Sequence, residues 1–286
     1  MSEPWKEYEF PAKKVTWLQR DTLLFNLSIG CRADEPQFEG DPRFSTFPTY
    51  PLELVFKLDH SEVIGFYGTV GSTDIPGVHK LDPRGLVDGD RTVEIYKPLP
   101  TTLLGHDFEF RSKLIDVYDK GKSGIVVRSE DCLIDAKSGE YLFYVGQGNW
   151  GGPRGPRSDK KPCLIDKLIW FSRSKLDRKA LICTASEVGK ELGYGGIINH
   201  GVFGYNKIAH EMVRRLGNGD PSSMLRISAK FAGPVRPGDT LVIHLWKNGV
   251  VADGSEEVQW SAQVRGTGQE CLCDGTAVIK PPTDFE

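Results

Sequence analysis

The sequence predicts an α+β protein made of two copies of one unit, each an antiparallel sheet curled around a central helix. Its second half has one amphipathic helical segment, followed by segments in which apolar and polar residues alternate. Its first half repeats this order after an apolar segment at 44–57, which would supply the other central helix. One helix followed by long strands favours an antiparallel sheet, and an order that occurs twice indicates internal duplication.

The helix and strands of the second half follow from periodicity. Apolar side chains recur at helical spacing between Val202 and Leu216, with charged residues on the opposite face. Residues 224–231 and 256–266 alternate apolar and polar side chains, which is the pattern of half-buried strands. Asn248-Gly249 and Gly266–Gly268 are typical turn sequences and are expected to connect strands.

The first half is expected to end in a linker. The stretch Gly148–Pro162 is rich in glycine, proline and charged residues, a composition that resists regular structure. We therefore expect an N-terminal unit at residues 1–150 and a C-terminal unit at 163–286. The strands of the N-terminal unit are expected at 92–99, 107–121, 124–135 and 140–148.

The composition is that of a globular chain without a preferred charged partner. Of the 286 residues, 39% are hydrophobic and 26% are charged, which is enough apolar surface for a substantial core. The net charge of −3 has no long block of one sign, so we expect neither a nucleic-acid nor a membrane partner. Since the N-terminus has no apolar signal segment and the C-terminus no peroxisomal address, a cytoplasmic location is expected.

The six cysteines form no CxxC pair. Cys271 and Cys273 would share one face of a strand, but no group of histidines accompanies them in the sequence. Ordinary reduced thiols are therefore expected, and neither a metal nor a redox cofactor is implied.

Several stretches, in a fixed order, carry a resemblance over nearly the whole chain. They are RDTLLFNLSIGC, FSTFPTY, TVEIYKPLPTT, DVYDKGKSGIVV, YVGQGNWGGPRGPR, HGVFGY and FAGPVRPGDTL. The chain resembles the MaoC-like, or type 2 (R)-specific enoyl-CoA hydratase, family. The resemblance implies a double hot-dog fold, in which a substrate-accommodating, non-catalytic N-terminal unit and a catalytic-type C-terminal unit join their sheets. It also implies a homodimer.

The resemblance implies a catalytic motif with one residue changed. In the family, the motif Asp-x-Asn-Pro-Leu-His-x-Asp is followed further along the chain by Leu-His-Gly. Asp177 matches the catalytic aspartate, Ile182 takes the place of the catalytic histidine, and Gly201 matches the glycine whose N–H holds the thioester oxygen. The resemblance therefore implies catalytic roles for Asp177 and Gly201, without the family's histidine.

Each candidate side chain has a second interpretation. His200 would take over the role of the lost histidine, or form a hydrogen bond near the helix start. Asn199 would contact the substrate or serve as the N-cap of the helix. The resemblance implies that Tyr50 lines an acyl-binding tunnel. Asp177 itself, in the charged stretch SKLDRK, would otherwise be a solvated carboxylate.

The resemblance leaves three functions open. Because Ile182 cannot orient or deprotonate water, a single acid/base carboxylate favours dehydration, isomerisation or cyclisation of an acyl thioester or polyketide-derived substrate in a biosynthetic pathway. Loss of a positioned acid/base group costs about 10²–10⁴-fold in rate. The alternatives are a conventional (R)-specific enoyl-CoA hydratase of fatty-acid metabolism, with another group as the base, and a catalytically inactive acyl-binding protein.

Overall fold

The computed structural model describes residues 6–35, 44–57, 87–119, 125–150 and 196–281. Its helices are α1 (Gln19–Ser28), α2 (Pro51–Lys57) and α7 (Gly201–Leu216), with a short 3-10 turn at Pro221–Ser223. Its strands are β1 (Lys13–Val15), β2 (Val87–Ile95), β3 (Phe108–Asp119), β4 (Ile125–Asp135), β5 (Tyr141–Trp150), β6 (Met224–Phe231), β7 (Leu241–Val250), β8 (Glu256–Val264) and β9 (Glu270–Ile279).

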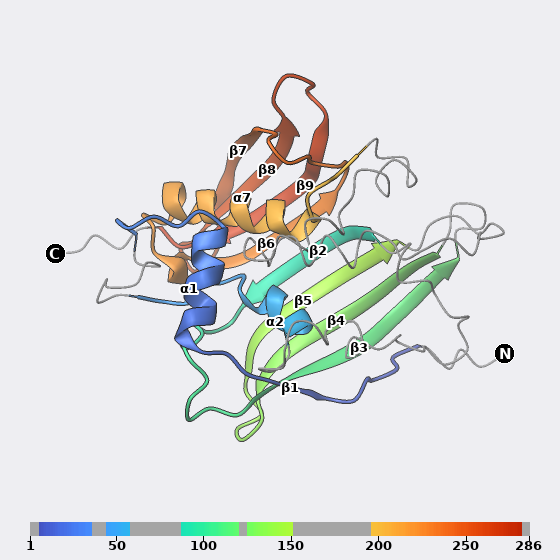
Figure 1. Ribbon diagram of the computed structural model, residues 1–286, viewed down its shortest axis with the longest axis vertical. Helices are drawn as coiled ribbons and strands as arrows, with labels where there is room; N and C mark the ends of the chain where they lie inside the picture. Colours follow the sequence, from blue (N-terminus) through green and yellow to red (C-terminus); the bar gives the residue numbers. More distant parts are fainter. Residues whose placement is uncertain (1–5, 36–43, 58–86, 120–124, 151–195, 282–286) are drawn as a thin grey trace.

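The described strands form one antiparallel sheet of nine strands, in the order β1-β3-β4-β5-β2-β6-β9-β8-β7. The pairing of β2 with β6, which places Val93 opposite Ile227, joins the sheets of the two halves edge to edge. α1, α2 and α7 lie on one face of this sheet (Figure 1). The predicted α+β architecture, with helices packed against antiparallel strands in both halves, is confirmed.

Both halves contribute to one continuous core. Trp17, Phe47 and Tyr50 from the first half belong to the same buried cluster as Tyr205 and Trp260 from the second. The alternation predicted for the strands is confirmed in β8, where every second side chain from Val258 to Val264 is buried. The side chains that the two units bury therefore form one shared core rather than two separate cores.

No described helix is long and apolar enough to cross a membrane.

Two predicted connections were wrong. Asn248-Gly249 is not a turn: β7 continues to Val250 with a register shift between Lys247 and Gly249, and the chain reverses at residues 251–254. The predicted linker begins too early, because β5 continues to Trp150 and pairs there with both β2 and β4. In both places, hydrogen bonds to neighbouring strands override the local turn preference of Gly and Asn.

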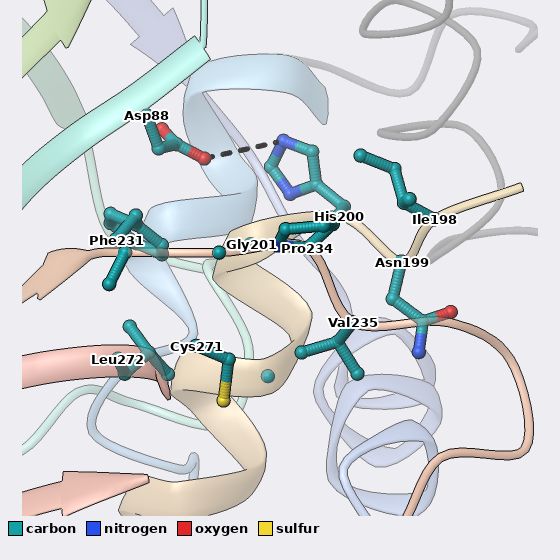
Figure 2. A pocket seen from close by; sticks show the side chains of 13 residues that line it. Asp88, Ile198, Asn199, His200, Gly201, Phe231, Pro234, Val235, Cys271 and Leu272 are labelled. Carbon is teal, nitrogen blue, oxygen red and sulfur yellow. Dashed lines mark ion pairs between the residues drawn. The ribbon is translucent and has the colours of Figure 1, made fainter. Parts of the chain in front are cut away.

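The first residues of β2 are irregular, and this irregularity shapes the site. The register of β2 against β5 shifts between Asp88 and Asp90. A Cβ on Gly89 would lie 2.8 Å from the carbonyl oxygen of Gly148, so only glycine allows β2 and β5 to approach this closely. The bulge places Asp88 beside Gly201, the first residue of α7 (Figure 2).

Candidate active site

A cavity of about 260 Å³ lies where α7 begins, next to the ends of β2, β6 and β9. Asp88, Asn199, His200 and Gly201 supply its polar side chains and the helix start, while the remaining walls are largely apolar (Figure 2). The apolar lining comes from Ile198, Phe231, Ala232, Pro234, Val235 and Leu272. Few polar groups in a largely apolar concavity are typical of a site for a small molecule.

Gly201 is the first residue of α7, so its N–H has no partner within the helix. A Cβ at this position would lie 2.7 Å from Phe231 Cδ1 and 3.3 Å from Asp88 Oδ2. The absence of a side chain therefore keeps the backbone close to both the aromatic wall and the carboxylate. The N–H of a residue that begins a helix and lines a cavity is suited to holding an oxygen that becomes negatively charged.

Asp88 and His200 point toward one another across the cavity (Figure 2). Their closest atoms, Asp88 Oδ2 and His200 Nε2, are 3.7 Å apart, and the two side chains are only 16% and 9% exposed. The distance is longer than a hydrogen bond, and it allows an ion pair when His200 is protonated. The first half of the chain thus contributes a carboxylate, and the second half an imidazole, to one site.

A chain of hydrogen bonds holds the Asp88 carboxylate in place. Arg91, which is 5% exposed, donates from Nη2 to Asp88 Oδ1 at 2.8 Å and to Gln147 Oε1 at 2.9 Å. Gln147 in turn donates from Nε2 to Asp131 Oδ2 at 2.8 Å. The charges of Arg91 and Asp88 are therefore paired on β2, and the Gln147 amide on β5 connects them to Asp131 on β4.

The ionisation of Asp131 makes the stability of the protein depend on pH, and this dependence tests the network. Burial raises the pKa of the Asp131 carboxyl, and a Ser112 hydrogen bond and the charge of Arg91 offset this only in part. The folded protein therefore holds this proton more tightly than the unfolded chain, whose Asp pKa is about 3.9. The contribution of Asp131 to stability must then fall as the pH rises from that value through the folded pKa.

We expect Asp131→Asn, which cannot ionise, to be more stable than the wild type at pH 7. The difference should shrink as the pH is lowered through and below about 4, where the wild-type carboxyl becomes protonated in both states. Urea unfolding of both proteins between these pH values measures this. An equal loss of stability in the variant at every pH would instead assign Asp131 a purely hydrogen-bonding role.

The structure brings together three of the predicted site residues. Asn199, His200 and Gly201 all line the cavity. The N-cap of α7 is His200, without a hydrogen bond from its side chain to the helix, so Asn199 is not the N-cap. The Asn199 backbone N–H donates to the carbonyl of Val235 at 2.6 Å, which holds this turn against the β6–β7 connection. The proposed substrate contact of Asn199 stays a prediction.

Two other predicted residues lie elsewhere or outside the described part. Tyr50 is 2% exposed, packs edge-on against Trp17 and Phe25, and is not among the residues that line the cavity. Its role in substrate binding stays a prediction. Asp177 and Ile182 fall outside the described residues, so their proposed roles stay predictions as well.

A second cavity, of about 600 Å³, adjoins the first and shares Asn199, Gly204 and Val235 with it. It runs along α7 beside β7. Its apolar lining includes Phe203, Ile208, Met212, Leu241, Ile243 and Leu245, and its charged lining includes Lys207, Arg214, Arg215 and Arg265.

Comparison with known proteins assigns the chain to a family. Residues 16–148 match the MFE-2 hydratase 2 N-terminal domain, and residues 182–268 match the MaoC like domain. The second match begins at Ile182, so Asp177 lies outside it. A probable dehydratase, NIT22 of Ajellomyces capsulatus, is 35% identical over 278 residues, which cover 88% of this chain and 74% of the relative. The chain belongs to the MaoC-like dehydratase and hydratase 2 family.

More distant relatives and solved structures agree. A probable enoyl-CoA hydratase 2 of Dictyostelium discoideum is 26% identical, covering 92% of this chain and 91% of the relative. A MaoC-like dehydratase from Phytophthora capsici has a similar structure, with a TM-score of 0.78, 22% identity, and coverage of 98% and 97% of the two chains. A Mycobacterium tuberculosis protein with a double hot-dog fold superposes with a TM-score of 0.53 and 12% identity, over 96% of each chain. The double hot-dog fold is confirmed.

Proposed function

We propose that the protein is a lyase of the MaoC type that removes or adds water at carbons 2 and 3 of an acyl thioester. One observation carries this proposal: the Gly201 N–H, the Asp88 carboxylate and the His200 imidazole meet in one largely apolar cavity. The reaction needs a group that moves the proton of carbon 2, a group that moves a proton at the hydroxyl, and a donor for the thioester oxygen. The cavity offers one group for each task.

In the direction of dehydration, Asp88 takes the proton from carbon 2 of a 3-hydroxyacyl thioester. The electron pair moves onto the thioester oxygen, to which the Gly201 N–H donates a hydrogen bond. When this enolate collapses, the bond between carbon 3 and oxygen breaks, and protonated His200 gives its proton to the departing hydroxyl, which leaves as water. A proton transfer from Asp88 to His200, whose atoms are 3.7 Å apart, then restores the pair.

The finer features of the substrate belong to the same proposal. The adjoining cavity of about 600 Å³ offers room for an acyl chain longer or bulkier than a few carbons. We therefore favour a polyketide-derived or similarly large acyl thioester in a biosynthetic pathway, where the same enolate also allows isomerisation or cyclisation. The scheme in which Asp177 is the single acid/base carboxylate remains a prediction, and it differs from this one in giving Asp88 no part in proton transfer. A homodimer and a cytoplasmic location remain predictions.

A second candidate is a conventional (R)-specific enoyl-CoA hydratase. The match of residues 16–148 to the MFE-2 hydratase 2 N-terminal domain favours it. In this case the same groups run in reverse: His200 takes a proton from water, and Asp88 protonates carbon 2. The two candidates differ in substrate size and direction rather than in the site.

The test is turnover of thioesters of increasing size. Purified protein is given crotonyl-CoA, its (R)-3-hydroxy counterpart, and 3-hydroxyacyl thioesters with long or cyclic acyl groups, and loss or gain of water is followed by mass and absorbance. Turnover of the large substrates with background rates on crotonyl-CoA supports the biosynthetic proposal. Rapid hydration of crotonyl-CoA supports the hydratase. Background rates on every thioester, with the protein folded, overturn the lyase proposal in favour of an acyl-binding role.

A further inference from the structure

A cluster of buried donor atoms lies outside the candidate active site. Cys31 and Glu35 are on the segment that follows α1, and His210 is in the middle of α7. The three residues are 6%, 5% and 3% exposed. The thiol sulfur, a carboxylate oxygen and a ring nitrogen all lie within 4.8 Å of one another.

The hydrogen bonds within this cluster leave one oxygen unsatisfied. Glu35 Oε2 lies 2.7 Å from His210 Nε2 and accepts the Arg32 backbone N–H at 3.1 Å. Glu35 Oε1 is buried and has no hydrogen-bond partner among the described residues; the nearest cation, Arg32 Nε, is 3.5 Å away. A buried carboxylate oxygen without a hydrogen bond raises the free energy of the folded protein. A cation bound at this atom would remove that cost.

We propose that Cys31, Glu35 and His210 form a binding site for a divalent metal ion, with Zn²⁺ as the ion that fits best. A thiolate, an imidazole and one carboxylate are a donor set that selects Zn²⁺ over Mg²⁺ or Ca²⁺, which prefer oxygen ligands. The site does not depend on the proposed lyase function, because none of the three residues lines the cavity at Gly201.

The geometry is close to what zinc requires. Bond lengths of about 2.0–2.3 Å to nitrogen, oxygen and sulfur imply ligand atoms about 3.3–3.7 Å apart in a tetrahedral site. The pair of Glu35 and His210 atoms, at 2.7 Å, must open slightly, and the remaining pairs, within 4.8 Å, must close by up to about 1.5 Å. Small side-chain rotations supply movements of this size.

The charges of the cluster also fit a dication. A thiolate and a carboxylate together neutralise Zn²⁺, so the loaded site would carry no net charge into the interior. Lys207 lies next to Gly30, the residue before Cys31, with its Nζ 2.5 Å from the point where a Cβ on Gly30 would lie. This positive charge opposes a cation, which is why both anionic ligands are required for tight binding.

The ion would connect two parts of the chain that meet only in the fold. His210 is on α7, the helix that begins with Gly201, and Glu35 lies 175 residues before it in the sequence. A metal at this point fixes the segment after α1 to α7. The bound ion would therefore be a stabilising cross-link between the two halves. One of its ligands would lie on α7, the helix whose first N–H is proposed to bind the oxyanion.

The experiment is a titration of metal-free full-length protein with Co²⁺ as a spectroscopic probe. We expect one equivalent to bind, with a thiolate-to-cobalt charge-transfer band and the visible bands of a tetrahedral ion, and Zn²⁺ to displace it. Cys31→Ser should lose the charge-transfer band, and His210→Asn should bind at least about 100-fold more weakly. Zn²⁺ at a hundred times its Kd should raise the wild-type Tm by about 5–10 °C.

Cys271→Ser is the matched control, since Cys271 is equally buried but donates its own hydrogen bond to the Ala262 carbonyl in the sheet. This variant should keep the band and the shift in Tm. The proposal is overturned if the folded wild type binds no stoichiometric Co²⁺, if the bound ion shows no thiolate band, or if Cys31→Ser binds as the wild type does. Because the first two outcomes need only the wild type, a variant that fails to fold does not remove the test.

Discussion

Asp88→Asn is expected to lower kcat for the thioester reaction by about 10²–10⁴-fold, the usual cost of losing a positioned acid/base group. The amide keeps the shape of the side chain, and its oxygen can still accept from Arg91, whose Nη2 is 2.8 Å from Asp88 Oδ1. It cannot take a proton from carbon 2 of the substrate. The loss should therefore appear in kcat rather than in KM, measured by steady-state kinetics on the best thioester substrate.

Asp90→Asn provides the matched control for this variant. Asp90 lies two residues further along β2, and its carboxylate pairs with Arg128 in a partly exposed ion pair, with side chains 30% and 46% exposed. Such pairs contribute about 0–1 kcal/mol to stability, so this variant should fold and turn over substrate within about threefold of the wild type. Equal kinetic losses in both variants, or none in Asp88→Asn, would remove Asp88 from the mechanism and leave Asp177 as the candidate carboxylate.

Sequence patterns predicted those parts of the fold that local periodicity determines. Most of the apolar stripe between Val202 and Leu216 is buried in α7, and every second side chain of β8 from Val258 is buried as expected. In β6, Ile227 and Ala229 are buried as expected, whereas Leu225 is only half-buried. α1 has no such stripe: Thr22 and Asn26 are buried, whereas Leu24 is 52% exposed. Tertiary contacts, such as the hydrogen bond from Asn26 Nδ2 to the Ser45 carbonyl, decide which face of α1 is inside, and no local pattern records them.

Only those residues of the candidate site that belong to the second half could be predicted from the sequence. Gly201 and His200 belong to a recognisable turn before an amphipathic helix, but Asp88 lies in the stretch Asp88-Gly89-Asp90, whose residue types are typical of a turn. This stretch becomes strand because β5 pairs with β2 along it, and β6 pairs with β2 from Asp90 onward. The pairing of β2 with β6 is what carries Asp88 to α7, and it depends on the docking of the two halves.

The buried cluster of Cys31, Glu35 and His210 was hidden for the same reason. Cysteine spacing in the sequence implied no metal, because two ligands lie after α1 and the third lies on α7. A site assembled from both copies of a duplicated unit has no short motif. Its residues become candidates only when the shared core places them together.

Gly201→Ala is expected to reduce kcat/KM by about 10²-fold while the protein remains folded. Gly201 does not have a positive φ, so alanine fits the backbone, but its methyl group would lie 2.7 Å from Phe231 Cδ1 and 3.3 Å from Asp88 Oδ2. The helix start must shift to relieve these contacts, and a shift of about 1 Å between an oxyanion donor and its oxygen costs about this much in rate. The destabilisation should be about 1–3 kcal/mol, as for other overpacked sites.

Two further variants separate this steric cause from a general effect of alanine. Gly204→Ala adds the same methyl group one turn further along α7, where no atom lies within 4 Å, so its loss of activity should be at least tenfold smaller. Phe231→Leu combined with Gly201→Ala should restore part of the rate, because the shorter side chain makes room for the methyl group. If Gly201→Ala alone keeps wild-type kcat/KM, the N–H at the start of α7 does not hold the reacting oxygen. If the double variant shows no recovery, the contact of the new methyl group with Asp88, rather than with Phe231, displaces the helix start. In that case the position of the Asp88 carboxylate and the position of the Gly201 N–H depend on one another.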